Sequence, residues 1–362
     1  MDTNKLERIL YAMRKADVPQ MIISSPASIF YLTGEWIIPG ERLLALYLNV
    51  NGGHKLVINR LFPQHKDLGV DLVWYSDTDD AVEILSRYIE EGKTIVIDKN
   101  WPARFLLRLQ ELNRRSHYVD GSYIIDNVRM IKNEKEQDLM RKASRANDKI
   151  MEQLIPLVSK GYTELELNKM VREMYAKAGH QDVSFDPITA YGRSGASPHH
   201  MPDHTKGKRG DSVVLDIGGI LNDYCSDMTR TVFIGEVSDK AREVYEIVKE
   251  AQRRGIEAAR AGNRMCDVDY ACRSYIEEKG YGPYFTHRTG HTIGIEEHEY
   301  GDVSSTNEEI IKVGQCFSIE PGIYLQEEEI GVRIEDLVLI TEEGCEVLNH
   351  YPKDLIIVPI EE

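Results

Sequence analysis

The chain has 362 residues, of which 42% are hydrophobic and 29% charged, a length that predicts about two domains with ordinary hydrophobic cores. Its net charge of −16 opposes binding to phosphate backbones and argues against a nucleic-acid partner. No apolar run reaches the ~20 residues that span a bilayer, and the charged start MDTNKLERIL lacks the apolar core of a signal peptide, so we expect neither membrane insertion nor secretion.

The first third of the chain alternates helix and strand patterns. Apolar residues recur at helical spacing over 6–13, and a strand-like run follows at 20–25. The runs 43–50 and 54–59 flank an Asn-Gly-Gly turn, which predicts a hairpin. We therefore predict an N-terminal α/β domain over residues 1–127.

The remainder, residues 128–362, has longer helices and antiparallel strands. Helical patterns cover 134–155 and 163–178, and two further helices interrupt the later strand-like runs near 239–260 and 267–279. Helices that are segregated from long antiparallel strands are typical of an α+β domain. The predicted fold class is therefore α+β, preceded by a smaller α/β domain.

The cysteines give information about the compartment. There are five, an odd number, and none forms a CxxC pair. This pattern disfavours a disulfide framework or a zinc–thiolate site and favours a reducing cytoplasm. We expect all five to be packing residues, because free cysteine behaves as a small buried hydrophobe.

Two aspartates stand in strand-like runs, VVLDIGG and SDMTRT, which a short turn separates. If the turn centres on Leu221-Asn222, Asp216 lies opposite Asp227, and if it centres one residue later, the two are diagonal neighbours. Both registers place the carboxylates on one surface, because side chains alternate along a strand. A buried pair would repel unless a cation lay between them. The alternative is a pair of solvated carboxylates, which fits Asp227 better than Asp216 in its apolar strand.

Three histidines lie close together in HRTGHTIGIEEHE, namely His287, His291 and His298. The glycines between them, Gly290 and Gly294, argue against a helix and thus against the HExxH arrangement of zinc proteases. A lone histidine is more often a core or surface residue than a ligand, but glycines permit a close approach of the backbone. From the residues alone, ligand and structural roles are equally open here.

Two glutamates complete the set of candidate ligands. Glu320 ends the apolar run CFSIE and precedes Pro321-Gly322, so it projects from a strand end. Glu335 follows Arg333 by two positions in VRIEDLVLI, so the two share a face, and a structural salt bridge between them is the alternative to a ligand role. Four carboxylates and one imidazole suit two divalent ions that hold one activated water. If the five candidates converge, the chain is a two-metal hydrolase.

The order VxDxG, SDxTR, HxxGH, xxEPG and RxED resembles the pita-bread metallopeptidases, and among them the Xaa-Pro group of prolidases and aminopeptidases P. The resemblance covers 128–362, while FYLTG at 30–34 and the α/β pattern of the first third resemble the creatinase-like N-terminal domain of that group. Methionine aminopeptidases share the catalytic fold but generally lack this domain. The resemblance therefore implies a pita-bread catalytic domain of the creatinase/aminopeptidase type, a smaller domain before it, and a homodimer.

The resemblance also implies the metal ligands. Asp216 would bind one ion, and His291 and Glu320 would bind the other. Asp227 and Glu335 would bridge both ions. The cofactor would be two divalent metal ions per chain, most often manganese, with cobalt or zinc as alternatives.

The implied reaction is hydrolysis of the Xaa-Pro bond of short proline-containing peptides. Two dications would lower the pKa of a bridging water towards ~7, and the resulting hydroxide would attack the carbonyl before proline. Glu320 would act as general base and as proton shuttle to the departing nitrogen. His298 and His199 would position the substrate and stabilise the oxyanion, and His287 would contribute to substrate binding. Arg333 would line the substrate side and orient the glutamate that follows it.

Departures from the family pattern leave the length of the substrate open. Thr292 replaces a glycine of many members, Arg193 stands where asparagine is commoner, and Asp302 lies where some prolidases carry an arginine for the dipeptide carboxylate. An Xaa-Pro dipeptidase is slightly favoured over an aminopeptidase P that acts on Xaa-Pro-Yaa peptides. A metal-free C–N hydrolase of the creatinase type and a non-catalytic binding module are weaker alternatives, because both lack the full ligand set. His200 and His204 match nothing in the family and are expected at the surface.

Overall fold

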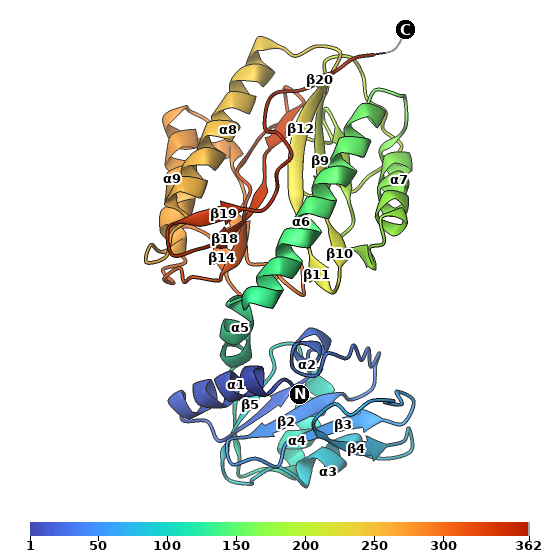
Figure 1. Cartoon of the computed structure of the whole chain (residues 1–362), viewed down its shortest axis with the longest axis vertical. Helices are drawn as coiled ribbons and strands as arrows, with labels where there is room; N and C mark the ends of the chain where they lie inside the picture. The colour runs from blue at the N-terminus through green and yellow to red at the C-terminus, as the bar shows by residue number, and fades with distance from the viewer. Residues whose placement is uncertain (361–362) are drawn as a thin grey trace. The chain divides into compact units, whose positions relative to one another are not determined.

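The computed structural model describes residues 1–360. These residues form two compact units, one over Met1–Arg129 and the other beginning at Met130 (Figure 1). Within the described range, none of the helices is long and apolar enough to cross a membrane.

The first unit is built on a six-stranded sheet with the order β4-β3-β2-β1-β5-β6. Its strands are β1 (Gln20–Ile23), β2 (Ala45–Asn49), β3 (Lys55–Asn59), β4 (Asp71–Tyr75), β5 (Thr94–Ile97) and β6 (His117–Asp120). Its helices are α1 (Thr3–Lys15), α2 (Pro26–Thr33), α3 (Ala81–Ser86), α4 (Ala103–Leu112) and α5 (Tyr123–Met130), the last of which runs on to the start of the second unit. Strand β1 pairs in parallel with β5, and β2 is antiparallel to both β1 and β3. The α/β pattern and the β2–β3 hairpin are therefore confirmed, with Gly52 and Gly53 at the positive φ that the turn requires.

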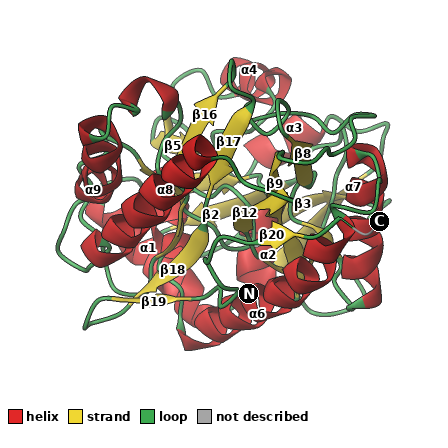
Figure 2. Cartoon of the chain, turned by 90° about the horizontal axis from the view of Figure 1, so that it is seen from above, coloured by secondary structure: helices red, strands yellow, loops and turns green. Residues whose placement is uncertain are grey.

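Four long helices flank the strands of the second unit on two sides (Figure 2). They are α6 (Glu134–Leu154), α7 (Glu164–Lys177), α8 (Asp239–Ala258) and α9 (Met265–Glu278), with short 3-10 turns at η1 (Ile155–Leu157) and η2 (Gly282–Tyr284). Helices α8 and α9 share one apolar core with Ile319 and Val338, and α6 and α7 share another with Leu215. All four helices match the predicted ranges to within a few residues.

The strands of the second unit form several small sheets that are mostly antiparallel. The largest has the order β20-β12-β9-β8 and consists of β8 (Ile188–Tyr191), β9 (Ser212–Ile217), β12 (Met228–Ile234) and β20 (Ile357–Val358). A second sheet contains β15 (Cys316–Ile319), β18 (Asp336–Ile340) and β19 (Cys345–Val347), and a hairpin contains β16 (Gly322–Leu325) and β17 (Ile330–Arg333). The remaining strands are β7 (Asp182–Val183), β10 (Gly219–Leu221), β11 (Tyr224–Cys225), β13 (Gly290–His291) and β14 (Asp302–Val303). This arrangement agrees with the predicted α+β class.

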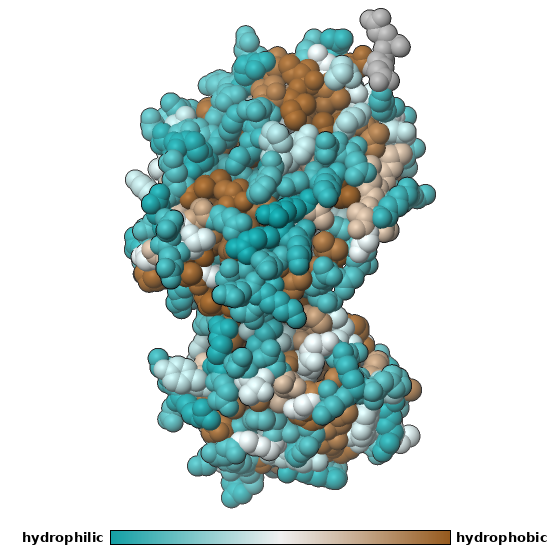
Figure 3. Space-filling model, in the orientation of Figure 1, coloured by the Kyte–Doolittle hydropathy of each residue, from teal (hydrophilic) through white to brown (hydrophobic). Residues whose placement is uncertain are grey.

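The visible surface agrees with the composition. Hydrophilic atoms cover most of the face in view, and smaller hydrophobic areas lie among them (Figure 3). The large apolar side chains instead fill the cores between helices and strands. These cores fix the strand ends on which the candidate ligands stand.

Candidate metal centre

One cavity of about 390 Å³ in the second unit takes its lining from strands that are far apart in the sequence. All five predicted ligands line it, namely Asp216, Asp227, His291, Glu320 and Glu335. Asp227, His291 and Glu335 each place one ligand atom within 4.8 Å of the others. The fold therefore brings the five candidates to one site.

Strand register brings the two aspartates together. Strands β9 and β12 are antiparallel with Asp216 opposite Thr229, and Asp227 immediately precedes β12. Asn222 and Asp223 form the turn, with φ values of 51° and 68°, which are left-handed values that Asn and Asp tolerate. Of the two registers that the sequence left open, the one with the later turn forms.

His291 turns one ring nitrogen into the cavity. Its Nδ1 lies 3.3 Å from the carbonyl oxygen of Thr292, which assigns the proton to Nδ1 and leaves Nε2 with a free lone pair. Nε2 lies 3.5 Å from Asp227 Oδ2 and 3.6 Å from Glu320 Oε1. Burial lowers the pKa of His291 to about 3. The ring is therefore neutral at pH 7, the state in which imidazole binds a metal.

Hydroxyl and backbone groups from neighbouring strands hold the two glutamates. Ser318 Oγ donates to Glu320 Oε1 (3.2 Å) and accepts from the His291 N–H (3.0 Å). Thr229 Oγ1 donates to Glu335 Oε2 (2.8 Å), and the Glu335 N–H donates to the Thr229 carbonyl (3.1 Å). Each glutamate thus keeps a second carboxylate oxygen for another partner.

The carboxylates of the cavity carry more negative charge than the protein neutralises. Asp216 Oδ1, Asp227 Oδ1 and Glu335 Oε1 are buried and accept no hydrogen bond from residues 1–360. Burial, followed by repulsion from neighbouring carboxylates, raises the pKa of Asp227 and of Glu335 well above ordinary values. Burial also raises the pKa of Glu320 to about 7. Buried carboxylate oxygens without donors are suited to divalent cations, so the donor set fits the implied pair of metal ions.

The predicted pairing of Arg333 with Glu335 is wrong. Strand β17 ends at Arg333 and β18 begins at Asp336, so Glu335 lies in the connection between two sheets. The alternation of side chains along a strand does not apply across this connection, and Arg333 and Glu335 need not share a face. Arg333 instead donates from Nη2 to Asp216 Oδ2 (2.7 Å) and from Nε to Thr229 Oγ1 (3.2 Å). It therefore reaches Glu335 only through the hydroxyl of Thr229.

Tyr324 is a residue of this region that the sequence analysis missed. Arg333 Nη1 donates to the Tyr324 hydroxyl (2.8 Å), which in turn donates to His287 Nε2 (2.8 Å). The acceptor role of Nε2 follows because His287 Nδ1 donates to the carbonyl of Arg288 (2.7 Å) and burial lowers the pKa of His287 to about 3. No periodic pattern in the sequence connects Tyr324 with His287, so this contact could not be predicted from it.

His298 and His199 line the same cavity from its exposed side. The side chain of His298 is 55% exposed, and its ring lies edge-on to that of His291 with centroids 4.1 Å apart. This is the placement expected of groups that contact a substrate. The adjacent Glu299 lies outside the cavity lining and forms a buried ion pair with Lys132 (2.8 Å).

Two departures from the family pattern contact their own loop and are absent from the cavity lining. Thr292 Oγ1 donates to the carbonyls of Tyr300 (2.6 Å) and Gly301 (3.1 Å). Asp302 Oδ1 accepts from Ser304 Oγ (2.7 Å). Both side chains therefore shape the 292–304 loop.

A second group of acidic and histidine side chains differs from the metal centre. Glu164 Oε2 accepts from the Asp203 N–H (3.1 Å) and lies 2.7 Å from His200 Nε2, while Glu164 Oε1 accepts from the Tyr191 N–H (3.0 Å). Both oxygens of this buried carboxylate already have partners, so the group is structural. The predicted surface position is confirmed for His204, which is exposed, whereas His200 is partly exposed and its ring packs against Glu164.

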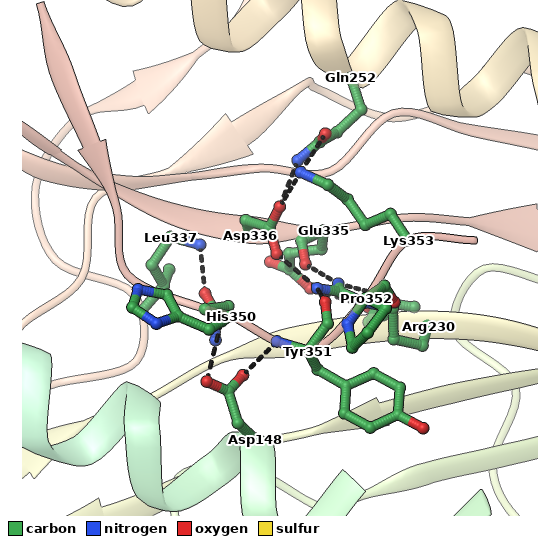
Figure 4. A network of polar contacts seen from close by, with 12 residues as sticks. Asp148, Arg230, Gln252, Glu335, Asp336, Leu337, His350, Tyr351, Pro352 and Lys353 are labelled. Carbon is green, nitrogen blue, oxygen red and sulfur yellow. Dashed lines mark hydrogen bonds and ion pairs between the residues drawn. The ribbon is translucent and has the colours of Figure 1, made fainter. Parts of the chain in front are cut away.

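A charged network surrounds Asp336, the residue after Glu335 (Figure 4). Arg230 Nη2 donates to Asp336 Oδ1 (2.7 Å), and Arg230 Nη1 donates to the Glu335 carbonyl (2.7 Å). Lys353 Nζ (2.5 Å) and Gln252 Nε2 (2.9 Å) donate to Asp336 Oδ2. The network thus fixes the backbone at Glu335 without using its carboxylate.

The similarity to known proteins extends over almost the whole chain. The model of metallopeptidase family M24 matches residues 138–342, and the model of the creatinase/prolidase N-terminal domain matches residues 5–131. An uncharacterized peptidase of Staphylococcus haemolyticus is 37% identical over 97% of this chain and 100% of its own length. A prolidase structure from Thermococcus sibiricus has a TM-score of 0.91 and 34% identity over 99% of both chains. An Xaa-Pro dipeptidase structure from Bacillus anthracis has a TM-score of 0.89 and 29% identity over 98% of this chain and 99% of its own.

Proposed function

Because this chain belongs to metallopeptidase family M24 and carries a creatinase/prolidase N-terminal domain, we propose that it hydrolyses the Xaa-Pro bond of dipeptides. The main support is a cavity that contains the four candidate carboxylate ligands and the neutral imidazole of His291, where three buried carboxylate oxygens accept no hydrogen bond from residues 1–360. The likeness to a prolidase and to an Xaa-Pro dipeptidase supports proline-containing dipeptides as substrates.

Two divalent ions would be held by Asp216, Asp227, His291, Glu320 and Glu335. We expect manganese, with cobalt or zinc as alternatives, because carboxylates with one imidazole suit such ions. When bound, the ions supply an acidified water and a polarised substrate carbonyl.

The side chains of the cavity then have separate roles. Glu320 lines the cavity with Ser318 bonded to one carboxylate oxygen, and we assign it the proton of the attacking water, which it passes to the departing proline nitrogen. His298 and His199, on the exposed side, position the peptide and stabilise the developing oxyanion. Burial lowers the pKa of His287 and keeps its ring neutral, and the ring bonds to Tyr324 and lines the substrate side. Arg333 keeps Asp216 oriented.

We further propose a cytoplasmic homodimer with domains over 1–127 and 128–362. The five cysteines are all free thiols, and three of them are buried, which supports a reducing compartment. The homodimer rests on the family resemblance, and the mass of the native protein in solution tests it.

Hydrolysis of Leu-Pro, Leu-Pro-Gly and Leu-Gly by the manganese-loaded protein tests the function. We expect the highest kcat/KM for Leu-Pro, loss of activity in EDTA, and recovery when manganese is restored. Equal hydrolysis of Leu-Gly would refute selectivity for proline. A preference for Leu-Pro-Gly would instead identify an aminopeptidase P, and activity that survives EDTA would refute the metal assignment.

A further inference from the structure

Arg288 lines the cavity that contains the candidate metal ligands. It lies between His287, whose ring contacts its carbonyl, and the ligand His291. Its side chain is exposed, and its guanidinium forms no hydrogen bond or ion pair with any other residue from 1 to 360. A charged group at the edge of a binding cavity is thus available to a ligand.

The other arginine of the cavity is already engaged. Arg333 is only 3% exposed and donates to Asp216, Thr229 and Tyr324. Its charge is balanced by the Asp216 carboxylate at 2.7 Å. Arg288 is therefore the arginine with donors to offer to a substrate.

The charge of Arg288 acts on the open side of the cavity. Burial and then Asp216 raise the pKa of Glu297 to about 7, and the guanidinium of Arg288 opposes this rise. Burial lowers the pKa of His298, and the same guanidinium lowers it further. Both groups line the cavity, so Arg288 lies within electrostatic reach of the region where a peptide binds.

We propose that Arg288 binds the C-terminal carboxylate of a dipeptide and thereby makes the site selective for dipeptides. The proposal rests on the proposed Xaa-Pro hydrolysis. Consecutive Cα atoms are about 3.8 Å apart, so the carboxylate of a dipeptide lies only about one residue beyond the bond that breaks, inside the same cavity. A guanidinium matches a carboxylate with two parallel hydrogen bonds. A longer peptide has a neutral amide at this position and gains little from the charge.

The position that serves this purpose in some prolidases is occupied differently here. Asp302 bears a negative charge, and its carboxylate accepts from Ser304. It is also absent from the cavity lining. Asp302 therefore offers no positive charge to a carboxylate in the cavity, whereas Arg288 on the HRTGH segment does.

The test uses manganese-loaded enzyme and three substrates, Leu-Pro, its C-terminal amide Leu-Pro-NH2, and Leu-Pro-Gly. We expect Arg288→Ala to lower kcat/KM for Leu-Pro about tenfold or more, mainly through KM, because a charge-assisted hydrogen bond is lost. Hydrolysis of the amide and of the tripeptide should change less than about twofold, since neither presents a carboxylate at this position. Arg288→Lys should restore part of the loss for Leu-Pro because it keeps the charge.

Arg193→Ala is the matched control. Arg193 is also exposed and unpaired within the described range, but it lines a separate cavity of about 450 Å³. The variant should keep wild-type kinetics on all three substrates. Unchanged melting temperature and manganese content in Arg288→Ala establish that the variant is folded, and Arg288→Gln provides a second neutral variant.

The possible results distinguish the role of Arg288 from the proposed Xaa-Pro hydrolysis itself. An equal loss on the dipeptide and its amide, or a selective loss in Arg193→Ala alone, would overturn the role of Arg288 while leaving Xaa-Pro hydrolysis intact. A wild-type enzyme that cleaves none of the three substrates would refute the proposed function and this inference with it. A selective loss on Leu-Pro in both neutral variants supports the inference.

Discussion

Glu335 and Asp336 are consecutive buried carboxylates, 1% and 0% exposed, and they differ in how their charge is balanced. Asp336 has Arg230 and Lys353 as counter-charges and Gln252 as a third donor. Glu335 accepts one hydrogen bond from a threonine, and its other oxygen accepts none from the described chain. Where the protein supplies the cation, the carboxylate is structural; where it does not, a metal ion can supply the charge.

Asp227→Asn should have the largest effect. The neutral amide is a weak bridging ligand, so we expect loss of bound metal and no detectable metal-dependent hydrolysis. The change also removes one of several repelling buried charges. The metal-free variant should therefore melt at a higher temperature than the metal-free wild type. Elemental analysis, peptide hydrolysis and thermal melting in EDTA measure the three effects.

Glu327→Ala serves as the control for this substitution. Glu327 is exposed in the turn between β16 and β17, so its loss should leave metal content, activity and melting unchanged. Full activity in Asp227→Asn would contradict the two-metal assignment. A lower melting temperature of that variant in EDTA would contradict the account of unbalanced charge.

Asp336→Asn should change stability in the opposite direction. It leaves the buried guanidinium of Arg230 without its counter-charge, which costs about 3–5 kcal/mol in comparable buried pairs. Urea denaturation of the metal-free protein measures the free energy of unfolding. A free energy of unfolding equal to that of the wild type would show that the charge network does not stabilise the fold. It would also contradict the structural role that distinguishes Asp336 from Glu335.

Thr229→Val should have a smaller effect, on metal affinity. The Thr229 hydroxyl orients Glu335 and accepts from Arg333, and loss of such a group behind a ligand typically lowers metal affinity about 10–100-fold. Competition with a chelator of known affinity measures this change. Thr231→Val on the same strand is the control, because the Thr231 hydroxyl bonds to the backbone of Arg333 and, among the described residues, to no carboxylate of the cavity. Equal losses of affinity in the two variants would show that Thr229 has no specific role.

The smallest predicted effect is a shift in pH dependence. In the metal-free protein the pKa values of Asp227 and Glu335 are raised and that of Glu320 is raised to about 7. The folded state then binds more protons than the unfolded state above about pH 4.5, so its stability falls as the pH rises towards 7. Bound metal ions offset this loss of stability, because they bind the deprotonated carboxylates and neutralise their charge.

Thermal melting with manganese and with EDTA checks this dependence at about pH 5.5 and pH 7.5. The gain in melting temperature from manganese should be larger at the higher pH. In Asp227→Asn the gain should be small at both values. If manganese raised the melting temperature of the wild type equally at both pH values, the raised pKa values of the cavity carboxylates would be contradicted.

Local patterns in the sequence predicted much of the fold and of the site. Strand parity placed Asp216 and Asp227 on one surface, and the choice between registers depended on Asn222 and Asp223, which adopt the left-handed conformation. Helix periodicity predicted the four long helices of the second unit. The order of the five motifs predicted a family that the comparisons confirm.

Contacts between distant segments were not predictable in this way. The pairing of Arg333 with Asp216 depends on the end of β17 and on the packing of β17 beside β9. The hydrogen bonds from Arg333 through Tyr324 to His287 join two segments whose spacing in the sequence carries no periodic signal. Such contacts are set by tertiary packing, which single-strand parity does not describe.

The number of metal ions bound per chain decides whether the five ligands form a two-metal site. The wild-type chain is reconstituted with manganese, freed of loosely bound ions, and measured by elemental analysis beside Asp227→Asn. We expect two ions per chain in the wild type and the loss of at least one in the variant. A wild-type chain that retains no divalent ion and still hydrolyses Leu-Pro would contradict it.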